Sequence, residues 1–269
     1  MRGRVALVTG ASAGIGRALC LRLAARGMHL GMAARSPAEL EAAAAEVRAL
    51  GVRALAVPTD VAEPDQCKRF VETCARELGG VDVLVNNAGI GMWARFADVQ
   101  DLSIYERMMR INYLGAVWTT HAALPYVTKS RGLIVAISSL TGKTGVPTRS
   151  GYAASKHAMQ GFFDSIRIEL AEAGVDVSVI SPGFVATDIR KRGFGADGRP
   201  VGESPRDEDE DTMPLAECVA RIERAIMKRE REVVMTTRAR LGQWLKLVAP
   251  RAVDRIAARA VRGKKDVSS

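Results

Sequence analysis

Short apolar runs alternate with longer stretches of helical periodicity along most of the chain. The apolar runs predict strands at 5–9, 29–33, 53–58, 81–85, 133–138, 176–180 and 232–235. The stretches between them predict helices at 14–26, 37–50, 63–78, 103–123 and 151–173. The predicted strands are continuously apolar rather than alternating, which is typical of strands covered on both faces in a parallel sheet. The pattern therefore predicts an α/β fold, a doubly wound parallel sheet of the Rossmann type with helices on both faces.

One segment interrupts this rhythm. Residues 190–213 contain closely spaced glycines and prolines followed by an acidic run at 207–211. Such a composition predicts a flexible surface loop, and its place after the sixth strand favours a loop that closes over substrate. The alternative is a solvated acidic loop with no such role. The length of 269 residues otherwise fits one α/β domain that spans residues 1–269.

The net charge of +9 is concentrated near the end of the chain. Residues 214–269 carry 14 Lys/Arg and 6 Asp/Glu, whereas the preceding 213 residues carry 25 and 24. Residues 239–269 form a basic C-terminal extension in which Leu241, Trp244, Leu245 and Val248 share one helical face, with Lys246, Arg251, Arg255 and Arg259 nearby. Packing of this face on the subunit or a partner is favoured over contact with an anionic membrane, because Pro250 should break a single membrane-lying helix. The extension has no nucleic-acid recognition motif or stacked aromatic residues, so nucleic acid is not an expected partner.

The four cysteines form no C-x-x-C pair and no histidine cluster accompanies them, so reduced thiols are expected and no metal site. The first predicted strand begins almost at the first residue, which leaves no room for a secretory signal. No apolar run is long enough to span a bilayer. The expected compartment is the cytoplasm.

A glycine-rich turn joins the first predicted strand to the first helix. It reads Thr9-Gly-Ala-Ser-Ala-Gly-Ile-Gly16. Glycines in this position allow a tight turn and close approach to a pyrophosphate, which the free N–H groups of the helix N-terminus then bind. Three glycines alone are a weak signal, but their place in a strand–turn–helix unit makes a dinucleotide site a strong prediction.

The end of the second predicted strand indicates which dinucleotide binds. Sites for NAD usually carry a carboxylate here for the ribose hydroxyls, but this chain has Arg35 and Ser36. A guanidinium pairs well with a phosphate, and a hydroxyl adds a further hydrogen bond. NADP(H) is therefore favoured over NAD(H), unless Arg35 simply faces solvent.

Tyr152 and Lys156 open a predicted helix, and their spacing of four puts them on one face. A lysine charge one turn away favours the phenolate and lowers the pKa of a tyrosine, which is otherwise a poor proton carrier at neutral pH. This pair would be weak evidence without the glycine turn.

With both motifs in place, the chain resembles the short-chain dehydrogenase/reductase family in its single-domain form. The resemblance covers nearly all of residues 1–190. Its motifs occur in the family's order, and they are Thr9 to Gly16, Asp60, Asn86-Asn-Ala-Gly89, Asn112, Ser139, Tyr152-x-x-x-Lys156, Pro182-Gly183 and Thr187. One mild departure is Ala13, where many members carry serine.

The resemblance implies an enzyme that moves a hydride between the cofactor and a carbonyl or alcohol substrate. Its catalytic residues would be Asn112, Ser139, Tyr152 and Lys156. Tyr152 would exchange a proton with the substrate oxygen, Ser139 would hold that oxygen, and Lys156 would bind the nicotinamide ribose. Ser138 could compete with Ser139, but the separation from Tyr152 matches the family better for Ser139. Asn112 would anchor a water in a proton relay to Lys156.

The resemblance also implies the cofactor contacts. They would be Gly10, Ser12, Gly14, Ile15, Gly16, Arg35, Ser36, Asp60, Val61, Asn87, Ala88, Gly89, Tyr152, Lys156, Pro182, Gly183, Val185 and Thr187. The predicted substrate residues are Ser139, Tyr152, Met92, Trp93 and Leu140, and Phe96, Val185 and Phe194 are further apolar residues that could face the substrate. Such a wall suits an apolar substrate, although each residue could equally be ordinary core.

Two functions remain open at this point. The first is an active NADPH-dependent carbonyl reductase or alcohol dehydrogenase, assembled as a homodimer or homotetramer. The second is a non-enzymatic NADPH-binding regulator on the same fold. The intact set of Asn112, Ser139, Tyr152 and Lys156 favours the enzyme, because a binding protein would need only the glycine turn and Arg35.

Overall fold

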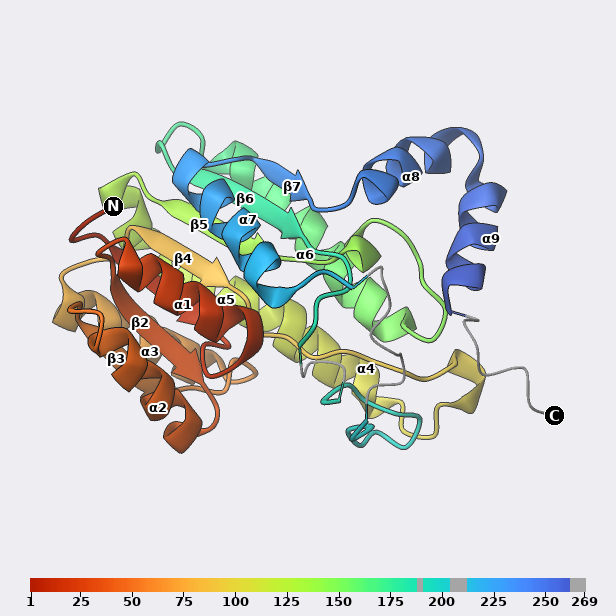
Figure 1. Cartoon of the computed structure of the whole chain (residues 1–269), viewed down its shortest axis with the longest axis horizontal. Helices are drawn as coiled ribbons and strands as arrows, with labels where there is room; N and C mark the ends of the chain where they lie inside the picture. Colours follow the sequence, from red (N-terminus) through yellow and green to blue (C-terminus); the bar gives the residue numbers. More distant parts are fainter. Residues whose placement is uncertain (188–190, 204–211, 262–269) are drawn as a thin grey trace.

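In the computed structural model, which describes residues 1–187, 191–203 and 212–261, seven parallel strands form one sheet in the order β3-β2-β1-β4-β5-β6-β7. The strands are β1 Val5–Thr9, β2 His29–Ala34, β3 Ala54–Pro58, β4 Val83–Asn86, β5 Leu133–Ile137, β6 Asp176–Ser181 and β7 Glu232–Val234. The helices are α1 Gly14–Ala25, α2 Pro37–Arg48, α3 Pro64–Leu78, α4 Ser103–Met108, α5 Gly115–Ser130, α6 Ser150–Glu169, α7 Leu215–Lys228, α8 Thr237–Val248 and α9 Pro250–Val261. The predicted doubly wound parallel sheet is confirmed (Figure 1).

Helices cover both faces of the sheet, as continuously apolar strands require. The core on one face combines β1 side chains such as Ala6 and Val8 with residues of α1, α2 and α7. The core on the other face combines Val5 and Leu7 with residues of α3, α5 and α6. Alternate residues of one strand therefore support two separate cores.

The segment around Asn112 differs from its prediction. A single helix over 103–123 is expected, but the chain forms α4, a π-helical segment Met109–Leu114, and then α5, which continues through Pro125 to Ser130. A π turn inserts an extra residue into the helix and is frequent at functional sites. Here it lies at the position of Asn112, whose side chain is fully buried.

Helix α7 was not anticipated from the sequence. Its buried residues Cys218, Val219, Ile222 and Ile226 recur at helical spacing, which is the signal that could have identified it. The predicted break at Pro250 is confirmed, because α8 ends at Val248 and α9 begins at Pro250.

The described part of the 190–213 loop packs against the segment that follows β4. Backbone hydrogen bonds join Trp93 and Gly91 to Phe194, and Gln100 to Ala196. Residues 204–211, with the whole acidic run, lie outside the described residues, and the closing role of the loop stays a prediction.

Candidate active site

The predicted site residues gather at the carboxyl edge of the sheet, where parallel strands place their outgoing loops. The glycine turn follows β1, Ser139 follows β5, and Pro182 to Thr187 follow β6. Tyr152 and Lys156 lie in the first turns of α6. Motifs separated by more than 100 residues therefore meet at one edge, as Figure 1 allows the reader to follow.

The glycine turn has the backbone geometry that a dinucleotide site needs. Gly10 and Gly14 have φ angles of 66° and 53°, which a side chain would strain. A Cβ on Gly16 would lie 2.1 Å from the carbonyl oxygen of Gly10, so only glycine fits there. Thr187 lies against Gly14, within ordinary van der Waals contact of a Cβ built there. The loop after β6 thus faces the N-terminus of α1, where a pyrophosphate would bind.

Asn87 ties the glycine turn to β4. Its Nδ2 donates to the carbonyl oxygens of Thr9 at 2.9 Å and Gly10 at 3.2 Å. The hydroxyl of Thr9 in turn accepts from the backbone N–H groups of Asn87 and Ala88. Thr9 is therefore part of the site's framework, a role that the sequence did not indicate beyond its place in the motif.

Arg35 and Ser36 follow the end of β2, at the same edge as the glycine turn. The side chain of Arg35 is exposed, and Ser36 occupies the N-cap of α2 without a side-chain capping bond. Asp60 lies after β3, and its Oδ1 accepts from the N–H of Ala62, which holds its turn. The arrangement fits a nucleotide with a ribose phosphate near Arg35, and these contacts stay predictions.

Tyr152 is buried beside Ser139. Burial raises the pKa of the Tyr152 phenol, while a side-chain hydrogen bond from Ser139 and the charge of Arg149 act in the opposite direction. The pKa of Tyr152 is raised overall, whereas the sequence predicted that Lys156 would lower it. Ser138 is buried, whereas Ser139 is half-buried and close enough to Tyr152 to affect its pKa; the choice of Ser139 as the substrate-binding serine stays a prediction.

Lys156 is buried with its ammonium group 5.8 Å from the centre of the Tyr152 ring. Nζ donates to the carbonyl oxygen of Ile137 at 2.9 Å, at the end of β5. Burial lowers the pKa of Lys156 to about 8. The lysine is thus a buried cation whose ammonium group can donate hydrogen bonds to the hydroxyl oxygens of a ribose.

Asn112 joins the helix to the loop after β4. Its Oδ1 accepts from the N–H of Ile90 at 2.8 Å, and its Nδ2 donates to the carbonyl of Ile90 and to Ser155 Oγ at 2.9 Å. Ser155 Oγ donates to the carbonyl oxygen of Tyr152. The side chain therefore connects the loop after β4 to the first turn of α6, which positions Tyr152; the water relay to Lys156 stays a prediction.

Arg149 is a site residue that the sequence reading missed. Its guanidinium is buried and lies 3.6 Å from the centre of the Trp93 ring, 5.2 Å from Phe184 and 5.9 Å from Tyr152. It occupies the N-cap of α6, three residues before Tyr152. A charged residue immediately before the catalytic helix was the available signal, but only the fold brings the three rings around it.

The predicted substrate wall is heterogeneous. Met92 is fully buried in a cluster with Ile104, Met108 and Tyr152, whereas Phe96 is exposed and stacks edge-on against Tyr105. Three of the residues are half-buried, namely Trp93, Leu140 and Phe194, and Val185 is buried. Trp93 carries the Arg149 guanidinium on its face, so the wall is not purely apolar.

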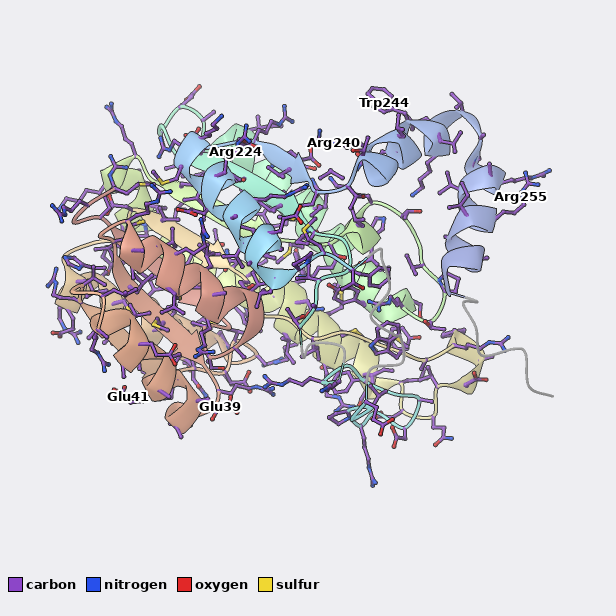
Figure 2. All side chains as sticks on the ribbon, viewed as in Figure 1. Glu39, Glu41, Arg224, Arg240, Trp244 and Arg255 are labelled. Carbon is purple, nitrogen blue, oxygen red and sulfur yellow. The ribbon has the colours of Figure 1, made fainter. Side chains whose placement is uncertain are left out.

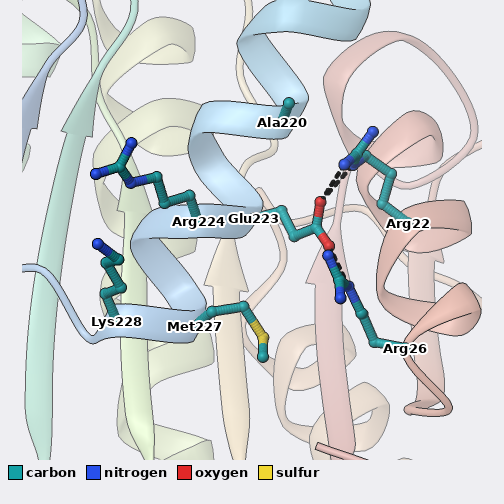
Figure 3. Close-up of a pocket in the computed structure, with 7 residues that line it drawn as sticks. All are labelled: Arg22, Arg26, Ala220, Glu223, Arg224, Met227 and Lys228. Carbon is teal, nitrogen blue, oxygen red and sulfur yellow. Dashed lines mark hydrogen bonds and ion pairs between the residues drawn. The ribbon is translucent and has the colours of Figure 1, made fainter.

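A hollow of about 340 Å³ lies elsewhere on the molecule, between the C-terminal end of α1 and α7 (Figure 3). Glu223 points from α7 toward Arg22 and Arg26 of α1, which bind it as ion pairs at 2.5 and 2.6 Å. Because α1 begins at the glycine turn and runs back toward the amino edge, this hollow is at the opposite end of the helix from the cofactor site.

A parallel sheet in this strand order, a glycine turn at its first crossover and a Tyr–Lys pair on the helix after β5 define a nicotinamide-dependent oxidoreductase of the Rossmann class. A family model described as short chain dehydrogenase matches residues 4–196. The chain belongs to the short-chain dehydrogenase/reductase family.

Two relatives show the breadth of the match. The chain is 34% identical over 258 residues to 11-beta-hydroxysteroid dehydrogenase 1A of Arabidopsis thaliana, covering 94% of this chain and 74% of the relative. It is 34% identical over 276 residues to dehydrogenase/reductase SDR family member 7B of Mus musculus, covering 100% and 85%. Both alignments extend beyond residue 196, into the part of the chain that the family model does not match.

Two solved structures share the fold. One is an alcohol dehydrogenase from Thermococcus sibiricus complexed with 5-hydroxy-NADP, with a TM-score of 0.73, 27% identity and coverage of 86% and 93%. The other is a short-chain dehydrogenase/reductase from Burkholderia phymatum in complex with NAD, with a TM-score of 0.81, 23% identity and coverage of 93% and 95%. Since one neighbour holds an NADP derivative and the other NAD, likeness of fold does not decide the cofactor.

Proposed function

We propose that this protein is an NADPH-dependent oxidoreductase that interconverts a ketone and a secondary alcohol on an apolar substrate, with Tyr152 as general acid and base. The observation that carries the proposal is the convergence of Tyr152, Ser139 and Lys156 at the carboxyl edge of the sheet. A cofactor-binding regulator would have no use for a buried phenol close to a serine hydroxyl and a buried ammonium group.

The reaction assigns one task to each side chain. When bound, the nicotinamide supplies or accepts the hydride. Tyr152 donates its phenolic proton to the carbonyl oxygen in reduction, and its raised pKa keeps that proton in place at neutral pH. Ser139 donates a hydrogen bond to the same oxygen and holds it near Tyr152. Lys156 binds ribose hydroxyls and keeps a positive charge close to the phenol as the proton leaves.

The cofactor preference rests on the loop after β2. Arg35 is exposed there, and a guanidinium binds phosphate through paired charge-assisted hydrogen bonds. Ser36 has a hydroxyl that its helix does not use for capping. These two residues support NADPH, and a preference for NADPH supports reduction as the working direction.

The substrate class follows from the wall and from the relatives. Phe194 packs against the cluster that contains Tyr152, and half-buried Trp93 and Leu140 add further apolar surface. Several relatives are named 11-beta-hydroxysteroid dehydrogenases, so rigid apolar ketones of steroid size are the first substrates to test.

The test is the Tyr152→Phe variant, assayed by NADPH consumption with a panel of cyclic and steroid ketones. Turnover should fall by about a hundredfold or more, because the acid is removed, while NADPH affinity measured by fluorescence titration should stay unchanged. Tyr105→Phe is the matched control, since Tyr105 donates to or accepts from Ser150 outside the proposed chemistry and should retain turnover. Near wild-type turnover in Tyr152→Phe would refute the assigned role, and NADPH binding without turnover of any ketone by the wild type would favour the regulator.

A further inference from the structure

Helices α8 and α9 expose apolar side chains that the rest of the described chain does not cover. Trp244 is 73% exposed and Val248 is 82% exposed, and Leu241, Leu247 and Ile256 are also exposed. Packing on the same subunit is therefore not observed for Leu241, Trp244 and Val248 in the described part of the chain, and the alternative of packing on a partner stays a prediction. Large exposed apolar patches on folded proteins usually mark a surface that binds something.

The two helices extend beyond β7, at the edge of the sheet (Figure 1). Arg240 Nε donates to the carbonyl oxygen of Val234, and Lys246 Nζ donates to that of Lys143, which fixes α8 to the body. Figure 2 shows Trp244 on the outer side of α8 and Arg255 on the outer side of α9, both away from the sheet. The α8–α9 pair is thus attached to the body through α8, and its outer side faces away from the sheet.

The charged residues of α8 and α9 are almost all basic. Residues 237–261 include six Lys/Arg and one acid, Asp254. Arg251 and Arg255 are exposed and four residues apart on α9, so they share one face of that helix. An apolar face flanked by cations matches the boundary between lipid headgroups and acyl chains, where tryptophan is also favoured.

We propose that α8 and α9 form a binding surface for an anionic lipid bilayer. The apolar side chains around Trp244 and Val248 enter the headgroup–acyl boundary, and Arg251 and Arg255 contact lipid phosphates. No described helix is long and apolar enough to cross a membrane, so the contact is with one leaflet. The inference does not depend on the proposed reaction, because it concerns a surface outside the active site.

A second copy of the chain is the main competing occupant. A twofold interface pairs the same surface with itself, so it would bring the exposed Arg251 and Arg255 of one α8–α9 element near those of the other. Like charges brought together at an interface are costly. An anionic bilayer instead offers phosphate groups to the exposed Arg251 and Arg255.

The test measures co-sedimentation of the full chain with vesicles of phosphatidylcholine alone and of phosphatidylcholine with phosphatidylglycerol. Binding should require the anionic lipid and weaken with added salt, because surface charge is screened. The double variant Trp244→Ser/Val248→Ser should weaken binding about tenfold or more, because it removes apolar surface that enters the bilayer. The double variant Arg251→Glu/Arg255→Glu should also weaken binding about tenfold or more, because each basic residue near an anionic surface strengthens binding roughly fivefold.

Matched controls distinguish vesicle binding by α8 and α9 from nonspecific binding by other exposed residues. Ile168→Ser removes an apolar side chain that is 78% exposed on α6, and the pair Lys68→Glu and Arg69→Glu reverses two exposed charges on α3. Both should bind vesicles as the wild type does. Light scattering after gel filtration measures the competing dimer. Absence of vesicle binding at low salt, equal weakening by the controls, or a dimer that Trp244→Ser and Val248→Ser disrupt without any vesicle binding would each overturn the proposal.

Discussion

The phenol of Tyr152 lies between opposing influences. Burial raises its pKa, and the Ser139 hydroxyl and the Arg149 charge lower it. A general acid needs a proton at working pH, whereas the tyrosinate that remains after donation needs nearby positive charge. Lys156, whose own pKa is lowered by burial to about 8, and Arg149 supply that charge from two sides.

Arg149 should therefore affect the pH dependence of the reaction. In Arg149→Met, the charge that opposes burial is lost, so the pH at which alcohol oxidation reaches half its maximum rate should move upward. Arg149→Lys should retain part of the effect, although an ammonium cannot stack flat on Trp93 as a guanidinium does. The measurement is kcat against pH in the oxidation direction.

Arg95→Met is the control, since Arg95 is exposed on the neighbouring loop. Arg95→Met should leave the dependence of kcat on pH unchanged. A profile for Arg149→Met that coincides with that of the wild type would show that the residue has only a packing role.

At the scale of elements, one buried carboxylate joins α1 to α7 beside the apolar core that the two helices share. Glu223 is 4% exposed and accepts from Arg22 at 2.5 Å and from Arg26 at 2.6 Å. Burial acts to raise the pKa of Glu223, but the hydrogen bonds and charges of Arg26 and Arg22 outweigh it and lower the pKa. Helix α1 carries the glycine turn, so this contact supports the cofactor site from its far end.

Glu223→Gln should lower the free energy of unfolding by about 2 kcal/mol, less than for a fully buried pair because both arginines are partly in solvent. Since a lowered carboxyl pKa contributes stability above the unfolded pKa and loses it as pH falls, the difference from wild type should shrink below about pH 4. Urea denaturation at several pH values measures both effects. Glu217→Gln, which breaks an exposed pair with Arg221 on the same helix, should change stability by only about 0.5 kcal/mol.

At the scale of the whole molecule, the cofactor would cross the sheet. The predicted contacts extend from Arg35 after β2, through the glycine turn after β1, to Lys156 near the end of β5. These strands belong to one sheet, in which β1 and β4 lie between β2 and β5. A ligand that contacts loops from several strands should stabilise the fold as a unit, because it binds the folded chain and not the unfolded one.

NADPH should accordingly raise the unfolding temperature more than NADH at the same concentration, with about 2.7 kcal/mol gained at a hundred times the dissociation constant. Arg35→Ala should weaken NADPH binding roughly tenfold or more and remove the difference between the two cofactors. Arg69→Ala, on exposed α3 surface, should leave the difference intact. Equal stabilisation of the wild type by both cofactors would show that Arg35 does not select the phosphate.

The sequence by itself determined the parts of this protein that local periodicity and local chemistry encode. Continuous apolar runs separated by helical stretches specify a parallel sheet, since only burial on both faces requires them. The glycines between the first strand and the first helix predict a dinucleotide-binding turn from their position alone. The spacing of Tyr152 and Lys156 places them on one helix face without any knowledge of the fold.

Only the tertiary structure decided what depends on contacts between distant segments. The π turn at Asn112 exists where its amide bonds Ile90 and Ser155, which lie 22 and 43 residues away. Arg149 becomes a buried cation because Trp93 and Phe184 meet above it. The apolar face of α8 could be recognised in the sequence, but whether it is covered depends on where α8 and α9 lie relative to the sheet, since periodicity specifies a face and not its partner.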